Sequence, residues 1–160
     1  MKKRNIAFEV AVYNNLEELS KQDANLMQKA ILARKDAYAP YSGFKVGAAL
    51  LLANNEVVIG SNQENASYPA GLCAERVAIF SAGANFPGIS VVSIAITAKS
   101  SNHLVDKPVA PCGSCRQVIA EYEFKQKKPI ELLLMGESGE VIKCSSLADI
   151  LPLGFNSSYL

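Results

Sequence analysis

The sequence predicts a three-layer α/β fold, in which helices cover both faces of a β-sheet. Two observations support this prediction. Helical and strand-like apolar patterns alternate along the chain, and the mixed apolar run "ISVVSIAIT" is typical of a strand buried on both faces. The length of 160 residues and the hydrophobic content of 49% suit one domain with a sizeable core. We therefore expect residues 1–19 to form an N-terminal extension and residues 20–160 to form a single domain.

The domain is expected to begin with a helix and a strand pair. Ser20, with Asp23 three residues later, marks a helix start. Apolar residues then recur at helical spacing: Leu26, Met27, Ala30, Ile31 and Ala37. Pro40 should end this helix, because the residue before a proline avoids the helical region. Residues 44–61, "FKVGAALLLANNEVVIGS", predict two strands joined by a turn at "NN".

The rest of the domain continues the alternation. Residues 73–84, "CAERVAIFSAGA", predict a helix for which Gly83 is a suitable stop. A strand at 89–97 is followed by a second helix at 112–124. Two more strands are expected in "PIELLLMG" and "EVIKC", then a short helix that Ser146 caps and that ends at Pro152. In the extension, "NIAFEVAV" alternates only partly and predicts a strand or an edge arm.

Charge and hydropathy exclude several classes of protein. A net charge of +1 and a pI of about 7.6 give no electrostatic case for a nucleic-acid footprint or an anionic membrane surface. No run of 18 apolar residues predicts a membrane span. The N-terminal "MKKRNIAFEVAVYNNLEEL" does not resemble a signal peptide, because polar residues interrupt its apolar part. We therefore expect a cytoplasmic protein whose four cysteines remain reduced.

The stretch "APCGSCRQV" raises the question of what Cys112 and Cys115 do. A lone C-x-x-C can be a thioredoxin-like redox pair, half of a zinc site, or two buried small residues. Cys73 distinguishes between them, since it also lies at the start of an expected helix. Free N–H groups and the helix dipole stabilise thiolates there. Three converging thiolates would hold one Zn²⁺ and leave its fourth position for water, as in catalytic zinc sites.

The residues that follow Cys73 add to this hypothesis. Glu75 could carry a proton between water and a substrate without binding the metal, and zinc nucleobase deaminases combine such a glutamate with P-C-x-x-C. Arg76 could hydrogen-bond sulfur and offset the negative charge of three thiolates. A solvated helix arginine is the alternative for Arg76, and Arg116 directly follows Cys115. We expect Cys144 to be buried in a strand and His103 to be a surface residue, so neither is expected to bind the metal.

Together, the motifs "YAPYSGFKVGAAL", "NQENASYPAGLCAERVAIF", "PCGSCRQV" and "LPLGF" resemble those of the small, homotetrameric cytidine deaminases. The resemblance covers about residues 26–155. It implies a mixed five-stranded sheet flanked by helices, a Zn²⁺ cofactor, and hydrolysis of cytidine and 2′-deoxycytidine to the uracil nucleosides with release of ammonia, a reaction of pyrimidine salvage. Glu75 would be the catalytic proton carrier. The extension and the long loop at 98–110 depart from the shorter members of the family.

The resemblance also implies substrate-binding positions. Asn62 and Glu64 match residues that hold the ribose hydroxyls, although Asn62 alone would be taken for a turn residue. Phe44 matches an aromatic that packs on the base, and an ordinary core phenylalanine is its alternative. The backbone of Ala74 matches a group that contacts the base. Three further positions match residues that reach a neighbouring subunit's site: Ala66, Tyr68 and Phe155.

Rival functions differ in what they require. A deaminase of another aminopyrimidine, such as a nucleoside antibiotic, would use the same metal site. Editing of polynucleotides needs a basic, stacking groove, and the chain offers only "KQKK". A structural zinc module needs a fourth protein ligand and no Glu75, and a redox protein does not need Cys73.

Overall fold

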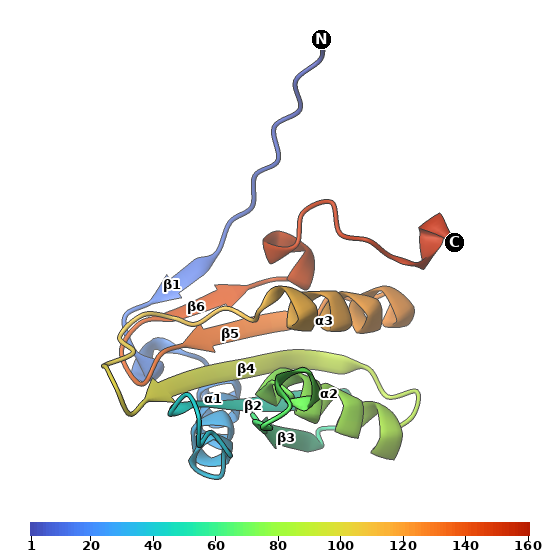
Figure 1. Ribbon diagram of the computed structural model, residues 1–160. Helices are drawn as coiled ribbons and strands as arrows, with labels where there is room; N and C mark the ends of the chain where they lie inside the picture. Colours follow the sequence, from blue (N-terminus) through green and yellow to red (C-terminus); the bar gives the residue numbers. More distant parts are fainter.

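The computed structural model describes residues 1–160 as a single sheet with helices on both faces (Figure 1). The helices are α1 (Lys21–Lys35), α2 (Ala74–Asn85) and α3 (Gly113–Gln126). The strands are β1 (Ala11–Tyr13), β2 (Phe44–Leu52), β3 (Val57–Ser61), β4 (Val91–Ser100), β5 (Glu131–Met135) and β6 (Val141–Cys144). The predicted three-layer α/β arrangement is confirmed.

The sheet has six strands in the order β1-β6-β5-β4-β2-β3, where five were expected. It is mixed, because β4 and β5 are parallel and the other neighbouring pairs are antiparallel. The additional strand is β1, which pairs Ala11–Tyr13 with Val141–Lys143. Only the end of the partly alternating stretch "NIAFEVAV" is paired, because β6 ends at Cys144 and offers no partner further along. Residues 1–10 extend away from the body as an arm (Figure 1).

The alternation of side chains along β2 divides the core between the two faces of the sheet. Leu50 and Leu52 pack with residues of α2 and α3, including Ile79 and Ile119. On the opposite face, Leu51 packs with residues of α1 such as Met27. Both α2 and α3 therefore cover one face, and α1 covers the other (Figure 1).

A glycine allows α2 to lie close to β3. A Cβ atom on Gly60 would lie 2.5 Å from the carbonyl oxygen of Ala74 and 2.6 Å from the nitrogen of Ala78. These distances are too short for any side chain, so the missing Cβ sets how near the first turn of α2 can approach the sheet. That turn carries Glu75, and Cys73 caps it, so Gly60 also fixes where these two residues lie.

Two predicted helix ends are wrong. The first helix ends at Lys35, five residues before Pro40, and the chain then turns. Gly83 does not stop α2, which continues to Asn85. Gly83 instead leaves room for the hydroxyl of Tyr122 on α3, which a Cβ atom at that position would strike. This glycine serves the packing of two helices, a requirement that local sequence does not reveal.

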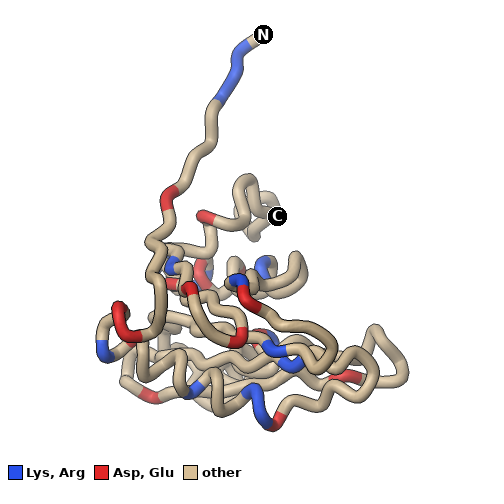
Figure 2. Tube along the Cα trace, turned by 90° about the vertical axis from the view of Figure 1, so that its left-hand side faces the viewer, with Lys and Arg blue, Asp and Glu red and all other residues tan.

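The predicted caps at Ser20 and Ser146 are confirmed, although the last helix ends at Ile150 and not at Pro152. The hydroxyl of Ser20 accepts a hydrogen bond from the Asp23 amide at 3.1 Å and caps α1. Ser146 caps a short 3₁₀ helix, η3 (Leu147–Ile150), in a capping box with Asp149. Charges of both signs alternate over the body, and Lys2, Lys3 and Arg4 lie at the tip of the arm (Figure 2). No helix is both long enough and apolar enough to cross a lipid bilayer.

Candidate active site

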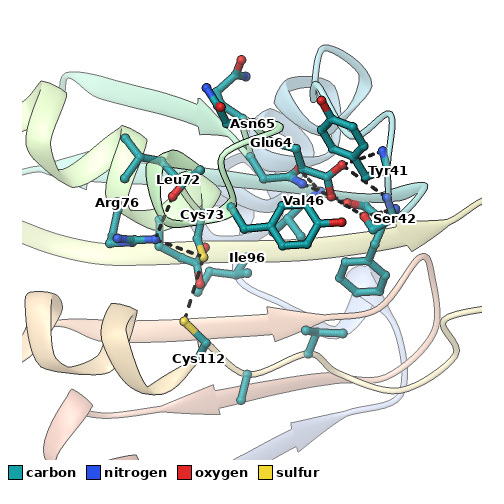
Figure 3. Close-up of a pocket in the computed structure, with 18 residues that line it drawn as sticks. Tyr41, Ser42, Val46, Glu64, Asn65, Leu72, Cys73, Arg76, Ile96 and Cys112 are labelled. Carbon is teal, nitrogen blue, oxygen red and sulfur yellow. Dashed lines mark hydrogen bonds between the residues drawn. The ribbon is translucent and has the colours of Figure 1, made fainter.

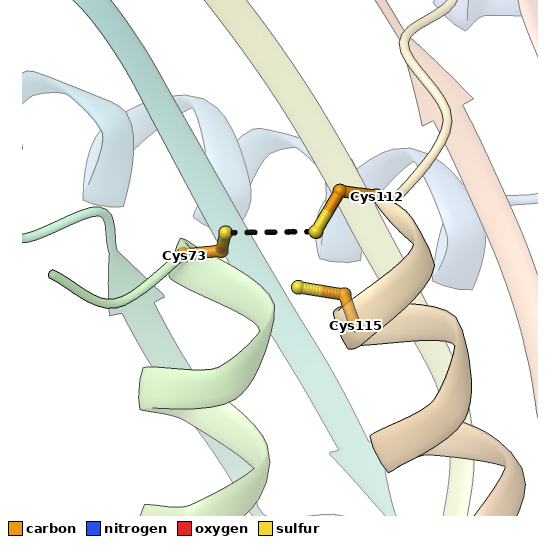
Figure 4. Close-up of side chains that lie close together, drawn as sticks. All are labelled: Cys73, Cys112 and Cys115. Carbon is orange, nitrogen blue, oxygen red and sulfur yellow. Dashed lines mark hydrogen bonds between the residues drawn. The ribbon is translucent and has the colours of Figure 1, made fainter. Parts of the chain in front are cut away.

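Three cysteine sulfurs converge between the first turns of α2 and α3 (Figure 4). Cys73 is the N-cap residue of α2, Cys112 is the N-cap residue of α3, and Cys115 follows within the first turn of α3. The sulfurs of Cys73 and Cys112 are 3.9 Å apart, and all three lie within 4.8 Å of one another. The sequence therefore predicted this grouping correctly.

The topology of the sheet explains why two helix starts meet. Strands β3 and β4 are both antiparallel to β2, so they run in the same direction, and β5 is parallel to β4. Helices α2 and α3 each connect two strands of this common direction on the same face. Both helices therefore begin beyond the carboxyl ends of strands, which is where open α/β sheets place their ligand sites.

The local backbone conformation points the thiols toward each other and not toward the free N–H groups of their own helices. Cys73 and Cys112 have extended backbone angles, and neither side chain accepts a capping hydrogen bond. An N-cap residue and the residue three positions later lie over the same first turn, which brings the sulfurs of Cys112 and Cys115 together. The sulfurs remain available for another ligand.

The charge state of the thiols supports binding of a cation. A hydrogen bond from Cys115, and then the neighbouring Arg76, lower the pKa of Cys73 to about 5 despite partial burial. The same hydrogen bond and burial raise the pKa of Cys115. The thiolate is the form that binds metal, so a lowered pKa at Cys73 favours binding of a cation.

The three cysteines are positioned to bind a metal ion, and their geometry fits Zn²⁺. Tetrahedral zinc with Zn–S bonds of about 2.3 Å separates two sulfur ligands by about 3.8 Å. The 3.9 Å between the sulfurs of Cys73 and Cys112 agrees with this value. Three sulfur donors leave a tetrahedral ion one position for a further ligand.

Glu75 lies beside the sulfurs without belonging to the group of three. It is 4% exposed and lines the cavity described below. Burial, and to a lesser extent the Cys73 thiolate, raise the pKa of its carboxyl group. A carboxyl group with a raised pKa can accept and return a proton near neutral pH.

Arg76 contacts the sulfur of Cys73 directly. Its Nη2 donates to the sulfur of Cys73 at 3.8 Å and to the carbonyl oxygen of Gly71 at 3.4 Å (Figure 3). The bond to Cys73 raises the pKa of Arg76, so the guanidinium stays charged. Its Nε is buried and has no partner. This contact with sulfur is the one expected of a residue that offsets thiolate charge.

A cavity of about 740 Å³ opens in front of these residues (Figure 3). Cys73, Cys112, Glu75 and Arg76 lie at one end. Phe44, Asn62 and Glu64, all expected to bind substrate, also line the cavity, and Glu64 lies with Tyr41 and Ser42 at the opposite end from Arg76 and Cys73 (Figure 3). The apolar side chains of Val46, Leu72, Ile96 and Val109 also contribute to the wall. A volume of this size suits a small organic ligand.

The polar residues at the second end are held by backbone groups. The Glu64 carboxylate accepts hydrogen bonds from the amide of Tyr41 at 2.9 Å, the amide of Ser42 at 3.3 Å, and the hydroxyl of Ser42. The bonds from Ser42 and Tyr41 lower the pKa of Glu64, so it is ionised. Asn62 accepts from the amide of Val46 at 2.7 Å and donates to the carbonyl oxygen of Phe44 at 2.9 Å.

The remaining predicted residues lie in different places. Tyr68 is 76% exposed and lies at the cavity rim, where its ring meets that of Tyr41 edge-on with centroids 6.1 Å apart. Ala74 is fully buried under Gly60, and Ala66 is exposed outside the cavity. Phe155 is 56% exposed beyond α3, where it stacks on Tyr159. Ala66, Ala74 and Phe155 are not among the residues that line the cavity of their own chain.

The residues that were not predicted include Ser42 and Tyr41, which fix Glu64, and Val109 and Ala110, which line the cavity. The dipeptide Ser42-Gly43 is a sequence sign of a turn, and Gly43 has a positive φ of 63° in the structure. As expected, His103 is exposed and Cys144 is buried outside the sulfur group. Burial raises the pKa of the Cys144 thiol.

Known proteins share both the sequence and the fold of this chain. Residues 20–128 match the family described as "Cytidine and deoxycytidylate deaminase zinc-binding region". A cytidine deaminase of Halalkalibacterium halodurans is 42% identical over 132 residues, which cover 82% of this chain and 92% of that protein. A cytidine deaminase of Sporosarcina psychrophila is 39% identical over 137 residues, covering 84% and 92%.

A solved structure gives the same result. The crystal structure of cytidine deaminase from Burkholderia pseudomallei aligns with a TM-score of 0.72 and 42% identity, over 86% of this chain and all of that one. The matched region, residues 20–128, includes all three sulfur ligands and Glu75. The chain belongs to the cytidine and deoxycytidylate deaminase family.

Proposed function

We propose that this protein is a zinc-dependent cytidine deaminase. It would convert cytidine and 2′-deoxycytidine to uridine and 2′-deoxyuridine, with release of ammonia, in cytoplasmic pyrimidine salvage. One observation carries the proposal: a group of three sulfurs and a separate buried carboxyl group, Glu75, lie at one end of a cavity whose other end holds Glu64 and Asn62. The cytidine deaminases that match over most of this chain support the choice of substrate.

Each part of the site would have a defined task. Cys73, Cys112 and Cys115 would hold Zn²⁺, which when bound lowers the pKa of a water molecule to about 7. Glu75 would accept a proton at its carboxylate and return it to ring nitrogen N3, and then assist protonation of the exocyclic amine. The water oxygen would become bonded to C4 as the C4–N bond breaks, so that cytidine and water give uridine and ammonia. Arg76 would reduce the negative charge on sulfur.

The other end of the cavity would bind the sugar and the base. The ionised Glu64 can accept a hydrogen bond from a hydroxyl, and the Asn62 amide can donate and accept. Phe44 would pack against the base, and the backbone of Ala74 would contact it from the start of α2. None of the charged residues that line the cavity is a lysine, and its one arginine is engaged with Cys73, which suits a nucleoside lacking phosphate.

We propose further that the enzyme is a homotetramer and that residues 20–160 form the catalytic unit, with residues 1–19 as an accessory segment. Ala66, Tyr68 and Phe155 would contact the site of a neighbouring copy, in agreement with their exposure outside or at the rim of their own cavity. The mass of the protein in solution, measured by sedimentation or light scattering, tests this association.

The activity is tested by incubating purified protein with cytidine, 2′-deoxycytidine, cytosine and adenosine while ammonia release is followed. We expect release from the two cytosine nucleosides only, its loss after chelation, and its recovery when Zn²⁺ is added back. Glu75→Gln protein, loaded with zinc, is the matched inactive control. Activity that survives complete removal of zinc, or that is absent with both cytosine nucleosides, would contradict the proposal.

A further inference from the structure

A second arginine, Arg116, lies next to the metal ligands but contacts backbone instead of sulfur. It directly follows Cys115 in α3. Its Nε donates to the carbonyl oxygen of Pro111 at 2.8 Å, and its Nη1 donates to the carbonyl oxygen of Ile150 at 2.8 Å. Pro111 is the residue immediately before Cys112, and Ile150 is the last residue of η3. The guanidinium therefore connects the approach to one metal ligand with the C-terminal segment.

The bond from Arg116 to Pro111 is the one hydrogen bond made by the segment that precedes Cys112. Residues 106–111 make no other hydrogen bond within the chain, to backbone or to side chain. Cys112 itself is exposed, and its side chain makes no capping bond. Arg116 therefore makes the one hydrogen bond that orients residues 106–111, the segment that leads into Cys112. Cys73, in contrast, follows a segment whose Gln63–Leu72 bridge has two backbone hydrogen bonds of 2.9 Å.

The second bond holds the guanidinium in place. With Nη1 on Ile150, the planar group cannot rotate away from Pro111 without losing both bonds. Arginine is suited to this task because it keeps its charge and presents several donors in a rigid plane, whereas lysine offers one ammonium group on a flexible chain.

We propose that Arg116 is a positioning residue of the metal centre: by holding the Pro111 carbonyl, it sets the direction in which Cys112 presents its sulfur to the ion. This inference rests on the proposed zinc enzyme, since it requires an ion on the three cysteines. Arg116 thereby differs in role from Arg76, which touches a ligand sulfur itself. Groups that orient metal ligands typically change metal affinity 10–100-fold when they are removed.

The test measures how firmly the protein keeps its metal. Wild-type, Arg116→Gln and Arg116→Lys proteins are loaded with Zn²⁺, and transfer of zinc to a chromophoric chelator is followed. We expect Arg116→Gln to release zinc about 10–100-fold faster than wild type and Arg116→Lys to fall between them. The thiolate-to-metal absorption band of Co²⁺-substituted protein should shift in Arg116→Gln, because Cys112 no longer holds its orientation.

Glu123 provides a matched control for general loosening. It lies in the same helix, and its carboxylate accepts from the amide of Ile130 at 2.7 Å, the amide of Leu147 at 3.0 Å and the hydroxyl of Ser146 at 2.7 Å. It therefore ties α3 to the same C-terminal segment but does not touch Pro111. Glu123→Gln should lower the melting temperature and leave the rate of zinc release within twofold of wild type.

Two outcomes would overturn the inference: zinc release from Arg116→Gln at the wild-type rate, or equally fast release from Glu123→Gln at a similar loss of melting temperature. Neither readout uses turnover, so the two proposals can fail separately. If wild type deaminates cytidine but Arg116→Gln keeps its zinc, only this inference is excluded. A wild-type protein that binds no zinc would remove the proposed function as well.

Discussion

The two ends of the cavity are built in opposite ways. At the metal end, the side chains of Cys73 and Cys112 form no capping bond, and the Nε of Arg76 is buried without a partner. At the other end, which we propose binds the sugar and call the sugar end, Asn62 and Glu64 are hydrogen-bonded to the backbone of residues 41–46. The first end presents three sulfurs that can bind an ion, whereas the polar groups of the second end are paired within the chain.

This difference indicates how each end should respond to change. A site that depends on an ion fails as a unit, because all its ligands must be present for the ion to bind. A site held by several separate hydrogen bonds loses function in steps, each about 0.5–1.5 kcal/mol for a neutral bond. We therefore expect all-or-none effects at the metal end and graded effects at the sugar end.

The largest effect is expected for Cys112→Ser. Removing one of three sulfurs should abolish zinc binding and turnover together, since a serine hydroxyl is a poor zinc ligand at neutral pH. Zinc content measured by atomic emission, alongside cytidine turnover, checks this. Cys144→Ala is the control, because that buried thiol lies outside the sulfur group. Cys112→Ser protein that retains one zinc per chain would contradict the all-or-none description.

The next largest effect should come from Glu75→Gln. The amide keeps the size of the side chain but cannot accept and return a proton, so kcat should fall about 10²–10⁴-fold. Zinc content should stay at the wild-type level, because Glu75 is not among the three sulfur ligands. Near-normal kcat in the zinc-loaded variant would exclude Glu75 as the proton carrier.

Ser42→Ala tests the graded response of the sugar end. It removes one of three donors to the Glu64 carboxylate and leaves the amides of Tyr41 and Ser42 in place. Loss of one of these three bonds should raise KM for cytidine about tenfold or less, with little change in kcat. Steady-state kinetics on zinc-saturated enzyme measure both constants. A complete loss of activity with normal zinc content would show that the sugar end also behaves as one unit.

Deletion of residues 1–10 should have the smallest effect on either end. These residues extend away from the body, and they contribute nothing to the cavity lining or the sulfur group (Figure 1). We expect kcat/KM within about twofold of wild type, as for surface changes remote from a site. A large loss of activity in the truncated protein, accompanied by a change in its mass in solution, would connect the arm to assembly of the enzyme.

The metal end could be predicted from sequence better than the sugar end. Cys73, Cys112 and Cys115 carry a chemical preference that few other residues share, and their places at helix starts follow from local signals such as Pro111. Ser20 and Ser146 could be predicted as helix caps from local sequence in the same way. These signals act within three or four residues of the chain, which is the range that sequence patterns report.

The features that escaped prediction depend on distant partners. Ser42 reaches Glu64 across 22 residues, and Arg116 reaches Ile150 across 34. Gly83 lies within α2 and leaves space for Tyr122 from another helix. The sixth strand exists because β6 offers an open edge to Ala11–Tyr13. None of these contacts leaves a periodic pattern in the sequence, so only the folded arrangement reveals them.

The contact between Gly60 and the first turn of α2 limits how this sequence can diverge. A methyl group there would meet the Ala74 carbonyl at 2.5 Å and push away the turn that carries Cys73 and Glu75. A conservative substitution of Gly60, such as Gly60→Ala, would thus abolish activity while the sheet and its core stay folded. Libraries that vary only the cavity wall would never sample this position, although it governs where two of the reactive groups stand.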